Sequence, residues 1–209
     1  LLADLVAFPT VSGEPNGEII GYIKSYLESH GVNVLLDVTD DGKQMNLFAT
    51  IGPKVDGGII LSGHTDVVPA SAEGWQGDPF ILRRDQGRLY GRGAVDMKGF
   101  VAIALAMVPD FVAARDRLRV PVHLAFTFDE EVGCFGSARM PEFLDSNDIS
   151  AEMAIIGEPT DMRPLIGHKC GMRKRLGEAN WAAFVKSPEA EHTPASGVLC
   201  CEGKLDGTP

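Results

Sequence analysis

The sequence is short of cysteine, of basic residues and of long apolar runs, and each shortage excludes a class of protein. Its 4 cysteines in 209 residues are too few for a disulfide scaffold and lack the Cys-x-x-Cys spacing of a zinc knuckle, so we expect reduced thiols. With 19 Lys and Arg against 29 Asp and Glu, the net charge of −10 argues against a nucleic-acid partner, because phosphate binding needs a basic surface. The lack of any apolar run of about 18 residues predicts no transmembrane helix and no membrane partner.

The sequence does contain alternating helical and strand patterns. Hydrophobic residues make up 44% of it, enough for one core or for one domain and part of another. Strands that alternate with helices predict an α/β fold in three layers, with a largely parallel mixed sheet flanked by helices. Apolar spacing predicts helices at residues 1–8, 17–30, 98–111 (buried on most sides) and 137–144, strands at 32–38, 46–51, 59–61, 120–128 and 154–156, and a hairpin or broad loop with strands at 80–82 and 88–90.

The pattern changes after about residue 170. A basic cluster at residues 172–175 is followed by Ser-Pro, Thr-Pro and glycine breaks that leave no sustained helical or strand period. We therefore treat residues 171–209 as a separate and poorly specified segment, and the basic cluster as a solvated patch.

Carboxylates recur just after the predicted strands or in glycine-rich turns. A histidine also stands among them. It belongs to the motif Gly63-His64-Thr65-Asp66-Val67-Val68-Pro69, which follows the apolar residues 58–61. One histidine with several carboxylates at successive strand ends is what a hydrolytic zinc site needs. The later acidic motifs are Gly93-Ala94-Val95-Asp96-Met97-Lys98-Gly99, Asp129-Glu130-Glu131-Val132-Gly133 and Gly157-Glu158-Pro159-Thr160.

The first motif has the chemistry of a metal ligand and its support. A neutral imidazole such as that of His64 suits zinc. Asp66 lies two residues on, so along an extended backbone it points the same way as His64. Its carboxylate can accept the other ring N–H, which fixes the tautomer and raises the basicity of the ligand.

Each acidic or imidazole side chain also has a purely structural interpretation. His64 could be a structural histidine, Asp66 could cap a turn, and Asp96 could be a helix N-cap. Glu130 with its neighbour could be a solvated acidic pair, and Glu158 could belong to a turn. For any one of these residues alone, the structural interpretation is at least as good as the interpretation as part of a metal site. All motifs together, in order and each at an expected sheet edge, favour the metal site.

The order of the motifs resembles a known family. His64–Pro69, Tyr90–Gly93 leading into Asp96–Gly99, Asp129–Glu131, and Gly157–Thr160 followed by Gly167-His168-Lys169 stand in sequence. Together they resemble the acetylornithine deacetylase / succinyl-diaminopimelate desuccinylase family of co-catalytic zinc amidohydrolases, over residues 1 to about 170. Any one of these motifs would be a weak signal, whereas all of them in order are specific.

The resemblance implies a role for each site residue. Asp96 would bridge two Zn²⁺ ions, for which cobalt or manganese could substitute, about 3.5–4 Å apart. His64 and Glu158 would complete one site, and Glu131 would bind the other ion. Glu130 would be the general base, which takes a proton from the attacking water and later gives it to the leaving amine. Asp66 would support His64.

The resemblance also implies an activity. It indicates a metal-dependent amide hydrolase that removes an N-acyl group from a small amino-acid substrate. N2-acetylornithine, cleaved to ornithine and acetate in arginine biosynthesis, is the first expectation, with a cytoplasmic location and a homodimer for full-length members. The alternatives are a succinyl-diaminopimelate desuccinylase or related exopeptidase, and, from another class, an inactive metal-binding fragment.

Two departures from the family pattern bear on activity. The family has a histidine near the far C-terminus that completes the second zinc site, and a lid and dimerisation domain inserted into the catalytic one. We therefore expect residues 1–170 to form a partial catalytic domain. Residues 171–209 lie where the lid domain would begin but do not resemble it, and His192 only distantly resembles a lid histidine. From a truncated or frame-disrupted chain of this kind we expect little or no turnover.

Overall fold

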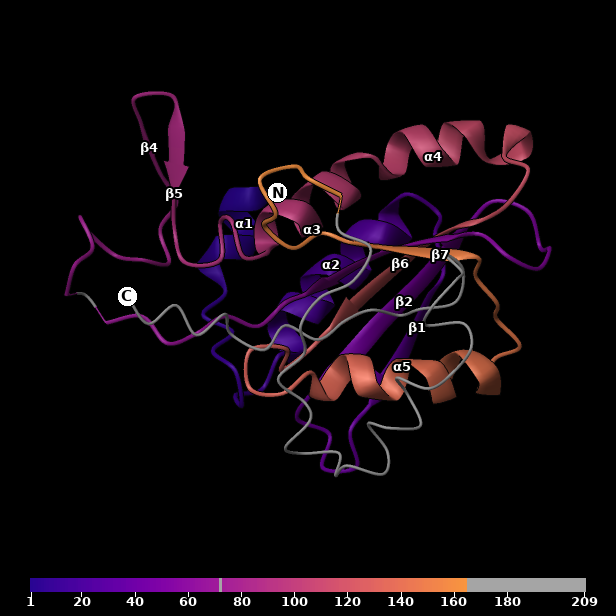
Figure 1. The fold of residues 1–209 in the computed structure, drawn as a ribbon, viewed down its shortest axis with the longest axis horizontal. Coiled ribbons are helices and arrows are strands. Elements are labelled where there is room, and N and C mark those ends of the chain that lie inside the picture. Colours follow the sequence, from indigo (N-terminus) through magenta and orange to yellow (C-terminus); the bar gives the residue numbers. More distant parts are fainter. Residues whose placement is uncertain (72, 165–209) are drawn as a thin grey trace.

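The computed structural model describes residues 1–71 and 73–164, which form a mixed five-stranded sheet and a separate two-stranded hairpin (Figure 1). The sheet order is β1-β2-β6-β3-β7. β2 pairs antiparallel with β1 and with β6, whereas β3 pairs in parallel with both β6 and β7. Four of the five strands therefore run in one direction, which confirms the largely parallel mixed sheet.

The elements are α1 (Leu2–Ala7), α2 (Gly17–Ser29), β1 (Val34–Val38), β2 (Met45–Ile51), β3 (Ile59–His64), β4 (Arg83–Asp85), β5 (Arg88–Tyr90), α3 (Lys98–Ala106), α4 (Val108–Ala114), the 3₁₀ turn η1 (Arg115–Arg117), β6 (Val122–Thr127), α5 (Phe135–Ser146) and β7 (Met153–Ile156).

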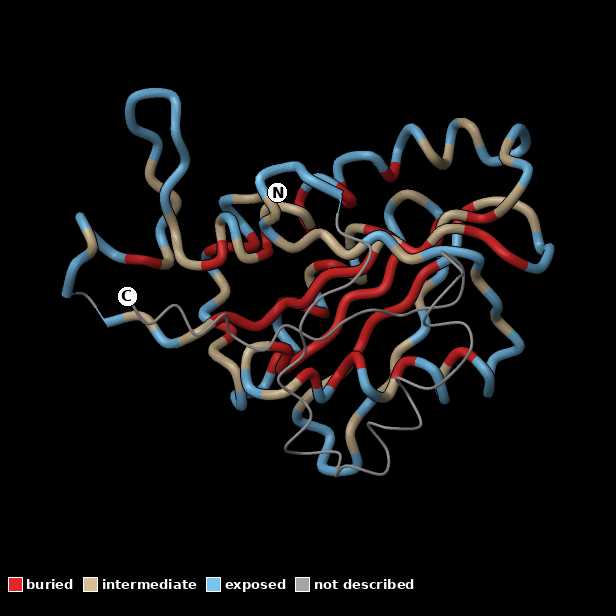
Figure 2. Tube along the Cα trace, viewed as in Figure 1, coloured by how far each residue is buried: buried red, intermediate tan, exposed pale blue. Residues whose placement is uncertain are grey.

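Helices cover both faces of this sheet. In Figure 1, α5 lies below the sheet and the helices α1 to α4 lie on its other side, so the molecule has the three predicted layers. Successive side chains of a strand point to opposite faces of the sheet. In β2, Leu47 and Ala49 join the core under α2 and α3, while Phe48 between them packs with α5. The long buried stretches drawn in red in Figure 2 follow the three central strands β2, β6 and β3, whereas the edge strands β1 and β7 contain no buried residue.

The parallel strands bring the carboxyl ends of β3, β6 and β7 to one edge. In their registers, His64 at the end of β3 lies beside Thr127 of β6, and Ser62 lies beside Ile156, the last residue of β7. The residues at and just after these strand ends contain three of the four motifs, whereas the motif with Asp96 lies between β5 and α3. This edge is where an open α/β sheet places its ligand crevice.

Two predicted elements differ in the structure. The single helix expected over 98–111 is two helices, with Met107 between them and Pro109 in the first turn of the second. Proline has no N–H for a continued helical ladder, which explains the break. The first strand of the hairpin lies at Arg83–Asp85, not at residues 80–82.

The α3 helix is also less buried than its composition predicts. Ile103 is 61% exposed and Met107 is 41% exposed, so one apolar side of this segment faces solvent. The N-cap of α3 is Met97 and makes no side-chain cap bond, so Asp96 is not the helix N-cap. Among the described residues, no helix has the length and apolar character needed to cross a membrane.

Candidate metal centre

His64 is held in a fixed orientation at the end of β3. Its side chain is almost fully buried, and its Nδ1 lies 2.9 Å from the main-chain oxygen of Asp66. A ring N–H donated to that oxygen leaves the Nε2 lone pair directed at the cluster of acids. The carboxylate of Asp66 is farther away, with Oδ1 at 3.4 Å from Nδ1. The nearest acceptor for the ring is therefore the backbone of Asp66.

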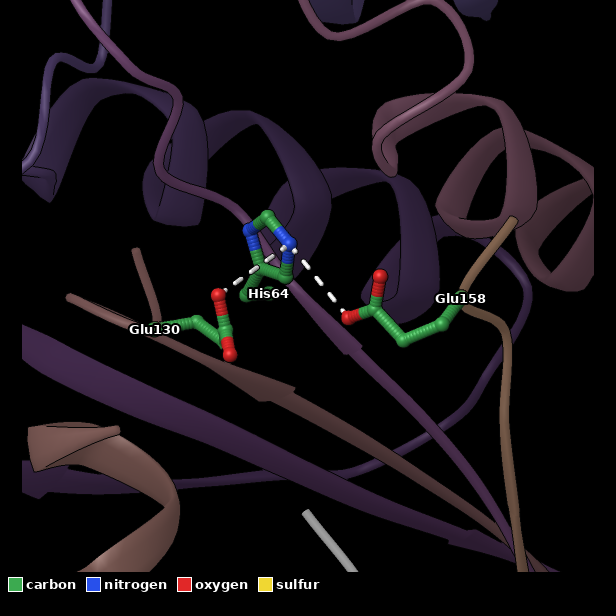
Figure 3. A group of neighbouring side chains, drawn as sticks. All are labelled: His64, Glu130 and Glu158. Atoms are coloured by element: carbon green, nitrogen blue, oxygen red, sulfur yellow. Dashed lines mark ion pairs between the residues drawn. The ribbon is translucent and has the colours of Figure 1, made fainter. Parts of the chain in front are cut away.

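Carboxylates from three other segments surround His64 Nε2. Asp96 Oδ1 lies at 3.1 Å, Glu158 Oε1 at 3.5 Å and Glu130 Oε2 at 3.9 Å. Figure 3 shows the His64 ring between the carboxylates of Glu130 and Glu158, which come from opposite sides. Glu131 joins through a second group, in which one donor atom each of His64, Asp96 and Glu131 lies within 4.8 Å of the others.

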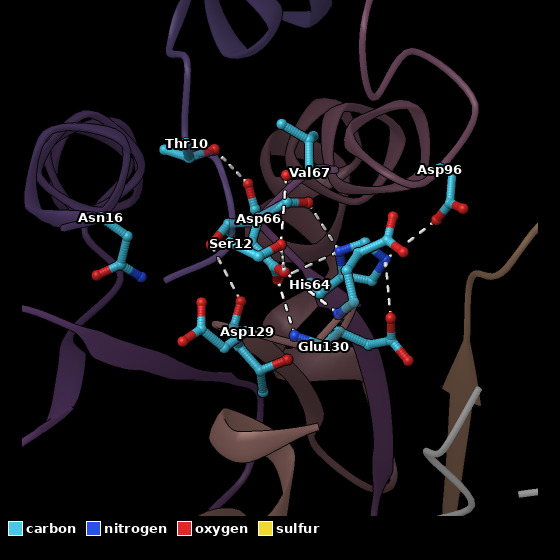
Figure 4. A network of polar contacts seen from close by, with 12 residues as sticks. Thr10, Ser12, Asn16, His64, Asp66, Val67, Asp96, Asp129 and Glu130 are labelled. Atoms are coloured by element: carbon cyan, nitrogen blue, oxygen red, sulfur yellow. Dashed lines mark hydrogen bonds and ion pairs between the residues drawn. The ribbon is translucent and has the colours of Figure 1, made fainter. Parts of the chain in front are cut away.

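Asp66 organises the turn that carries the two glutamates. Its Oδ1 accepts the N–H of Glu130 at 3.0 Å, and its Oδ2 accepts the N–H of Glu131 at 3.3 Å. The hydroxyl of Ser12 donates to the same Oδ2 at 2.7 Å (Figure 4). Asp66 is 2% exposed, so these bonds lie in a water-poor interior.

Backbone geometry explains how this turn and the last motif reach the site. Asp129 has φ 50°, a left-handed conformation that turns the chain sharply after β6. Gly157 follows β7, and its N–H donates to Ser62 of β3 at 3.1 Å. A Cβ on Gly157 would lie 1.8 Å from the Phe100 ring, so only glycine fits between α3 and this strand end.

The cluster has the electrostatics of a crowded acidic site. Burial alone would lower the pKa of His64, but hydrogen bonds to Asp66 and Asp96 outweigh it and raise the pKa well above its usual value. Burial also opposes ionisation of Asp66, yet its contacts with His64 and Ser12 lower the pKa of that carboxyl. Burial, followed by the charge of Asp96, raises the pKa of Glu131 to about 7.

The donor set suits a divalent cation. An imidazole nitrogen and carboxylate oxygens are the ligands that zinc accepts, and their charge compensates for that of the ion. Two groups, His64 with Glu130 and Glu158, and His64 with Asp96 and Glu131, each hold three donor atoms within 4.8 Å of one another. A cation there would offset both the burial of Glu131 and the repulsion from Asp96, which together raise the pKa of Glu131.

The structure thus brings together all six residues predicted for the site: His64, Asp66, Asp96, Glu130, Glu131 and Glu158. Sequence reasoning missed the contributions of Ser12 and Lys98. Lys98 is fully buried near Asp66, and its Nζ donates to the backbone oxygen of Phe8 at 2.6 Å. The signal for Lys98 was present, because a lysine stands inside the Asp96 motif among apolar residues. The predictions for His168, His192 and the segment 171–209 fall outside the described residues.

The three-layer α/β fold and the acidic cluster around His64 are of the metallopeptidase type, and comparison with known proteins agrees. Residues 60–200 match the peptidase family M20/M25/M40. The chain belongs to this family of hydrolases, and membership implies metal binding. It is 35% identical over 196 residues to an acetylornithine deacetylase of Proteus mirabilis (strain HI4320), covering 90% of this chain and 49% of the relative. The chain therefore spans about half the length of that curated relative.

Solved structures show the same fold. An M20 family metallo-carboxypeptidase, Sso-CP2 from Sulfolobus solfataricus, is 26% identical with a TM-score of 0.63, over 75% of this chain and 36% of that one. Human carnosine dipeptidase 1 has a TM-score of 0.65 at 24% identity, over 81% of this chain and 39% of that one. These matches agree with the three-layer architecture.

Proposed function

We propose that the site is a zinc-dependent amidohydrolase centre that removes N-acyl groups from small amino acids, with N2-acetylornithine as the first substrate. The observation that carries the proposal is the convergence of His64 Nε2 with carboxylates from three later motifs, at 3.1 to 3.9 Å for Asp96, Glu158 and Glu130. The substrate comes from the likeness to the acetylornithine deacetylase of Proteus mirabilis, at 35% identity.

The residues divide into ligands and a base. His64, Asp96, Glu131 and Glu158 would hold the metal, because donor atoms of His64, Asp96 and Glu131 lie within 4.8 Å of one another and Glu158 Oε1 lies 3.5 Å from His64 Nε2. When bound, zinc polarises the amide carbonyl and lowers the pKa of water toward about 7. The protein's own side chains would position the substrate and transfer the proton.

Glu130 is the proposed base. Its carboxylate is 3% exposed and lies beside His64, where it can take the proton from the attacking water and pass it to the leaving amine. The N–H of Glu130 is fixed by Asp66, so its side chain starts from a defined backbone position. Burial of His64, Glu130 and Glu158 strengthens the charge interactions among these three side chains.

Substitution of Glu130 by glutamine tests this division of roles. In a full-length relative, Glu130→Gln keeps the shape of the side chain but cannot take a proton, so zinc content should be retained while turnover falls by at least about 10²-fold. Zinc by elemental analysis and acetate release are the two measurements. Glu130 also lies with His64 and Glu158 in a group that could hold a metal. Loss of zinc together with activity would therefore make Glu130 a ligand and exchange its role with that of Glu131.

The substrate is tested by direct comparison. The zinc-loaded chain is incubated with N2-acetylornithine, N-succinyl-diaminopimelate and a dipeptide, with Glu130→Gln as the blank. We expect slow acetate release from N2-acetylornithine above that blank. Preference for the succinyl compound or the dipeptide would favour a desuccinylase or an exopeptidase instead. Zinc binding with no hydrolysis of any compound would favour the reading as an inactive metal-binding chain.

A further inference from the structure

A loop near the N-terminus lies against the site although it is distant in sequence. Val11 forms an isolated parallel bridge with Val67, which lies inside the His64 motif. The N–H of Val67 donates to Thr10 at 2.9 Å, and the N–H of Ser12 donates back to Val67 at 3.0 Å. The main chain therefore fixes the place of Ser12 beside the residue that precedes Val67, which is Asp66.

The Ser12 hydroxyl completes the set of bonds around the Asp66 carboxylate. It donates to Asp66 Oδ2 at 2.7 Å, and the backbone amides of Glu130 and Glu131 also donate to this carboxylate (Figure 4). The ring of His64 is held mainly elsewhere, since its Nδ1 is 2.9 Å from the Asp66 carbonyl and 3.4 Å from the carboxylate. The carboxylate of Asp66 thus acts chiefly on the turn that carries the two glutamates.

A second contact joins the same loop to the same turn. The N–H of Gly13 donates to Asp129 Oδ1 at 2.7 Å, and the side-chain amide of Gln44 donates to Asp129 Oδ2, also at 2.7 Å. Asp129 is the residue with φ 50° at the start of the turn. The loop therefore contacts the turn at Asp129 directly and at Glu130 and its neighbour through Asp66.

We propose that Ser12 is a positioning residue of the metal centre. Its hydroxyl holds the Asp66 carboxylate in the rotamer that accepts the amides of Glu130 and Glu131, and so sets where both glutamate side chains begin. This inference rests on the proposed function, because it assigns Glu131 to the metal and Glu130 to the proton. Groups that support ligands in this way commonly change metal affinity by about 10–100-fold.

Three variants of the 209-residue chain separate positioning from general stability. Ser12→Ala removes the hydroxyl, and Ser12→Thr keeps it. Ser25→Ala is the control, because that exposed hydroxyl on α2 bonds only to the backbone oxygen of Gly21. Amide hydrogen exchange is measured on the metal-free chain, and Co²⁺ affinity is measured by titration of its absorption spectrum.

We expect Ser12→Ala to speed exchange at the amides of Glu130 and Glu131 by about tenfold, while amides of the central strands keep their protection. Co²⁺ affinity should fall by about tenfold or more, with an altered spectrum. Ser12→Thr and Ser25→Ala should both behave as the unaltered chain.

Unchanged exchange and unchanged Co²⁺ binding in Ser12→Ala would overturn the inference. Equal acceleration at every amide would also overturn it, since it would show a general loss of stability. If the unaltered chain binds no Co²⁺ but Ser12→Ala still speeds exchange at the two amides, the proposed metal function fails while the link from Ser12 to the turn stands.

Discussion

Glu131 makes metal binding depend on pH near neutrality. Burial and the charge of Asp96 raise the pKa of Glu131 to about 7, so below that pH a proton competes with the metal for this carboxylate. We expect zinc affinity to rise roughly tenfold between pH 6 and pH 8 on account of this one proton. Titration calorimetry in two buffers of different ionisation enthalpy measures the affinity and the released proton together.

The same pKa shift acts in the opposite sense on the stability of the metal-free chain. The folded chain holds the proton of Glu131 up to a pKa of about 7, whereas the ordinary pKa of this carboxyl is 4.5. The free energy of unfolding should therefore decline as pH rises from 4.5 to 7. Glu131→Gln should flatten that decline. A variant with the same pH dependence as the unaltered chain would show that Glu131 does not titrate in this range.

Gly157 is the residue where an added methyl group would disturb the site most directly. A Cβ there would lie 1.8 Å from the Phe100 ring, so Gly157→Ala must displace either α3 or the segment that carries Glu158. We expect a loss of stability of about 1–3 kcal/mol and weaker zinc binding. Gly21→Ala is the matched control, because nothing lies within 4 Å of a Cβ there. Equal effects of the two substitutions would contradict the packing argument.

Most candidate ligands could be predicted from sequence, because His64, Glu131 and Glu158 stand at or just after the ends of the parallel strands β3, β6 and β7, which meet at one edge. Asp96 instead lies between β5 and α3, and its motif was the signal for it. The detailed role of Asp66 could not be predicted in the same way. Sequence spacing placed its carboxylate against the His64 ring, whereas the carbonyl at 2.9 Å is the nearer acceptor. Whether the ring donates to the carbonyl or to the carboxylate of Asp66 depends on side-chain rotamers, which sequence spacing does not determine. The contact of Ser12 depends on a loop 54 positions away along the chain, which no local pattern shows.

At the scale of elements, Lys98 joins α3 to the end of α1. The side chain is fully buried, and its Nζ donates to the Phe8 carbonyl at 2.6 Å. Burial lowers the pKa of Lys98 to about 8, with Asp66 opposing that shift. Lys98→Met keeps most of the apolar stem but leaves the Phe8 carbonyl without this donor. We expect a loss of about 1–3 kcal/mol in the free energy of unfolding, measured in urea.

Lys24→Met on α2 is the control for Lys98→Met. Lys24 is an exposed lysine paired with Glu28 at 2.7 Å, and such surface pairs contribute little. Its substitution should change stability by less than about 0.5 kcal/mol. If Lys98→Met has an effect as small as that of Lys24→Met, the bond to Phe8 does not hold α1 in place.

Most elements were predictable because apolar residues recur at a regular spacing along their whole length. The helix α2 (Gly17–Ser29) and the strand β2 (Met45–Ile51) match the expected ranges within a residue or so. The interval 98–111 was less predictable, because residues 100–108 are uniformly apolar and a run without periodicity does not show where one helix ends and the next begins. Pro109 was the available signal for the break.

At the scale of the whole molecule, the sheet concentrates negative charge at one edge. The chain has a net charge of −10, and buried or half-buried carboxylates from three segments meet at His64. Without a cation, such a cluster opposes folding. A metal that binds only the folded chain should stabilise it, by about 2.7 kcal/mol at 100 times the dissociation constant.

The central claim is that this edge of the sheet is a metal centre built around His64. The most direct test is the number of zinc ions bound per chain, by elemental analysis after dialysis, for the unaltered chain, His64→Ala and His30→Ala. His64 belongs to both candidate metal groups, whereas His30 bonds to Tyr26 at the end of α2. The structure predicts at least one bound Zn²⁺ in the unaltered chain and in His30→Ala, and none in His64→Ala. Equal zinc content in all three, or no zinc in the unaltered chain, would contradict the claim.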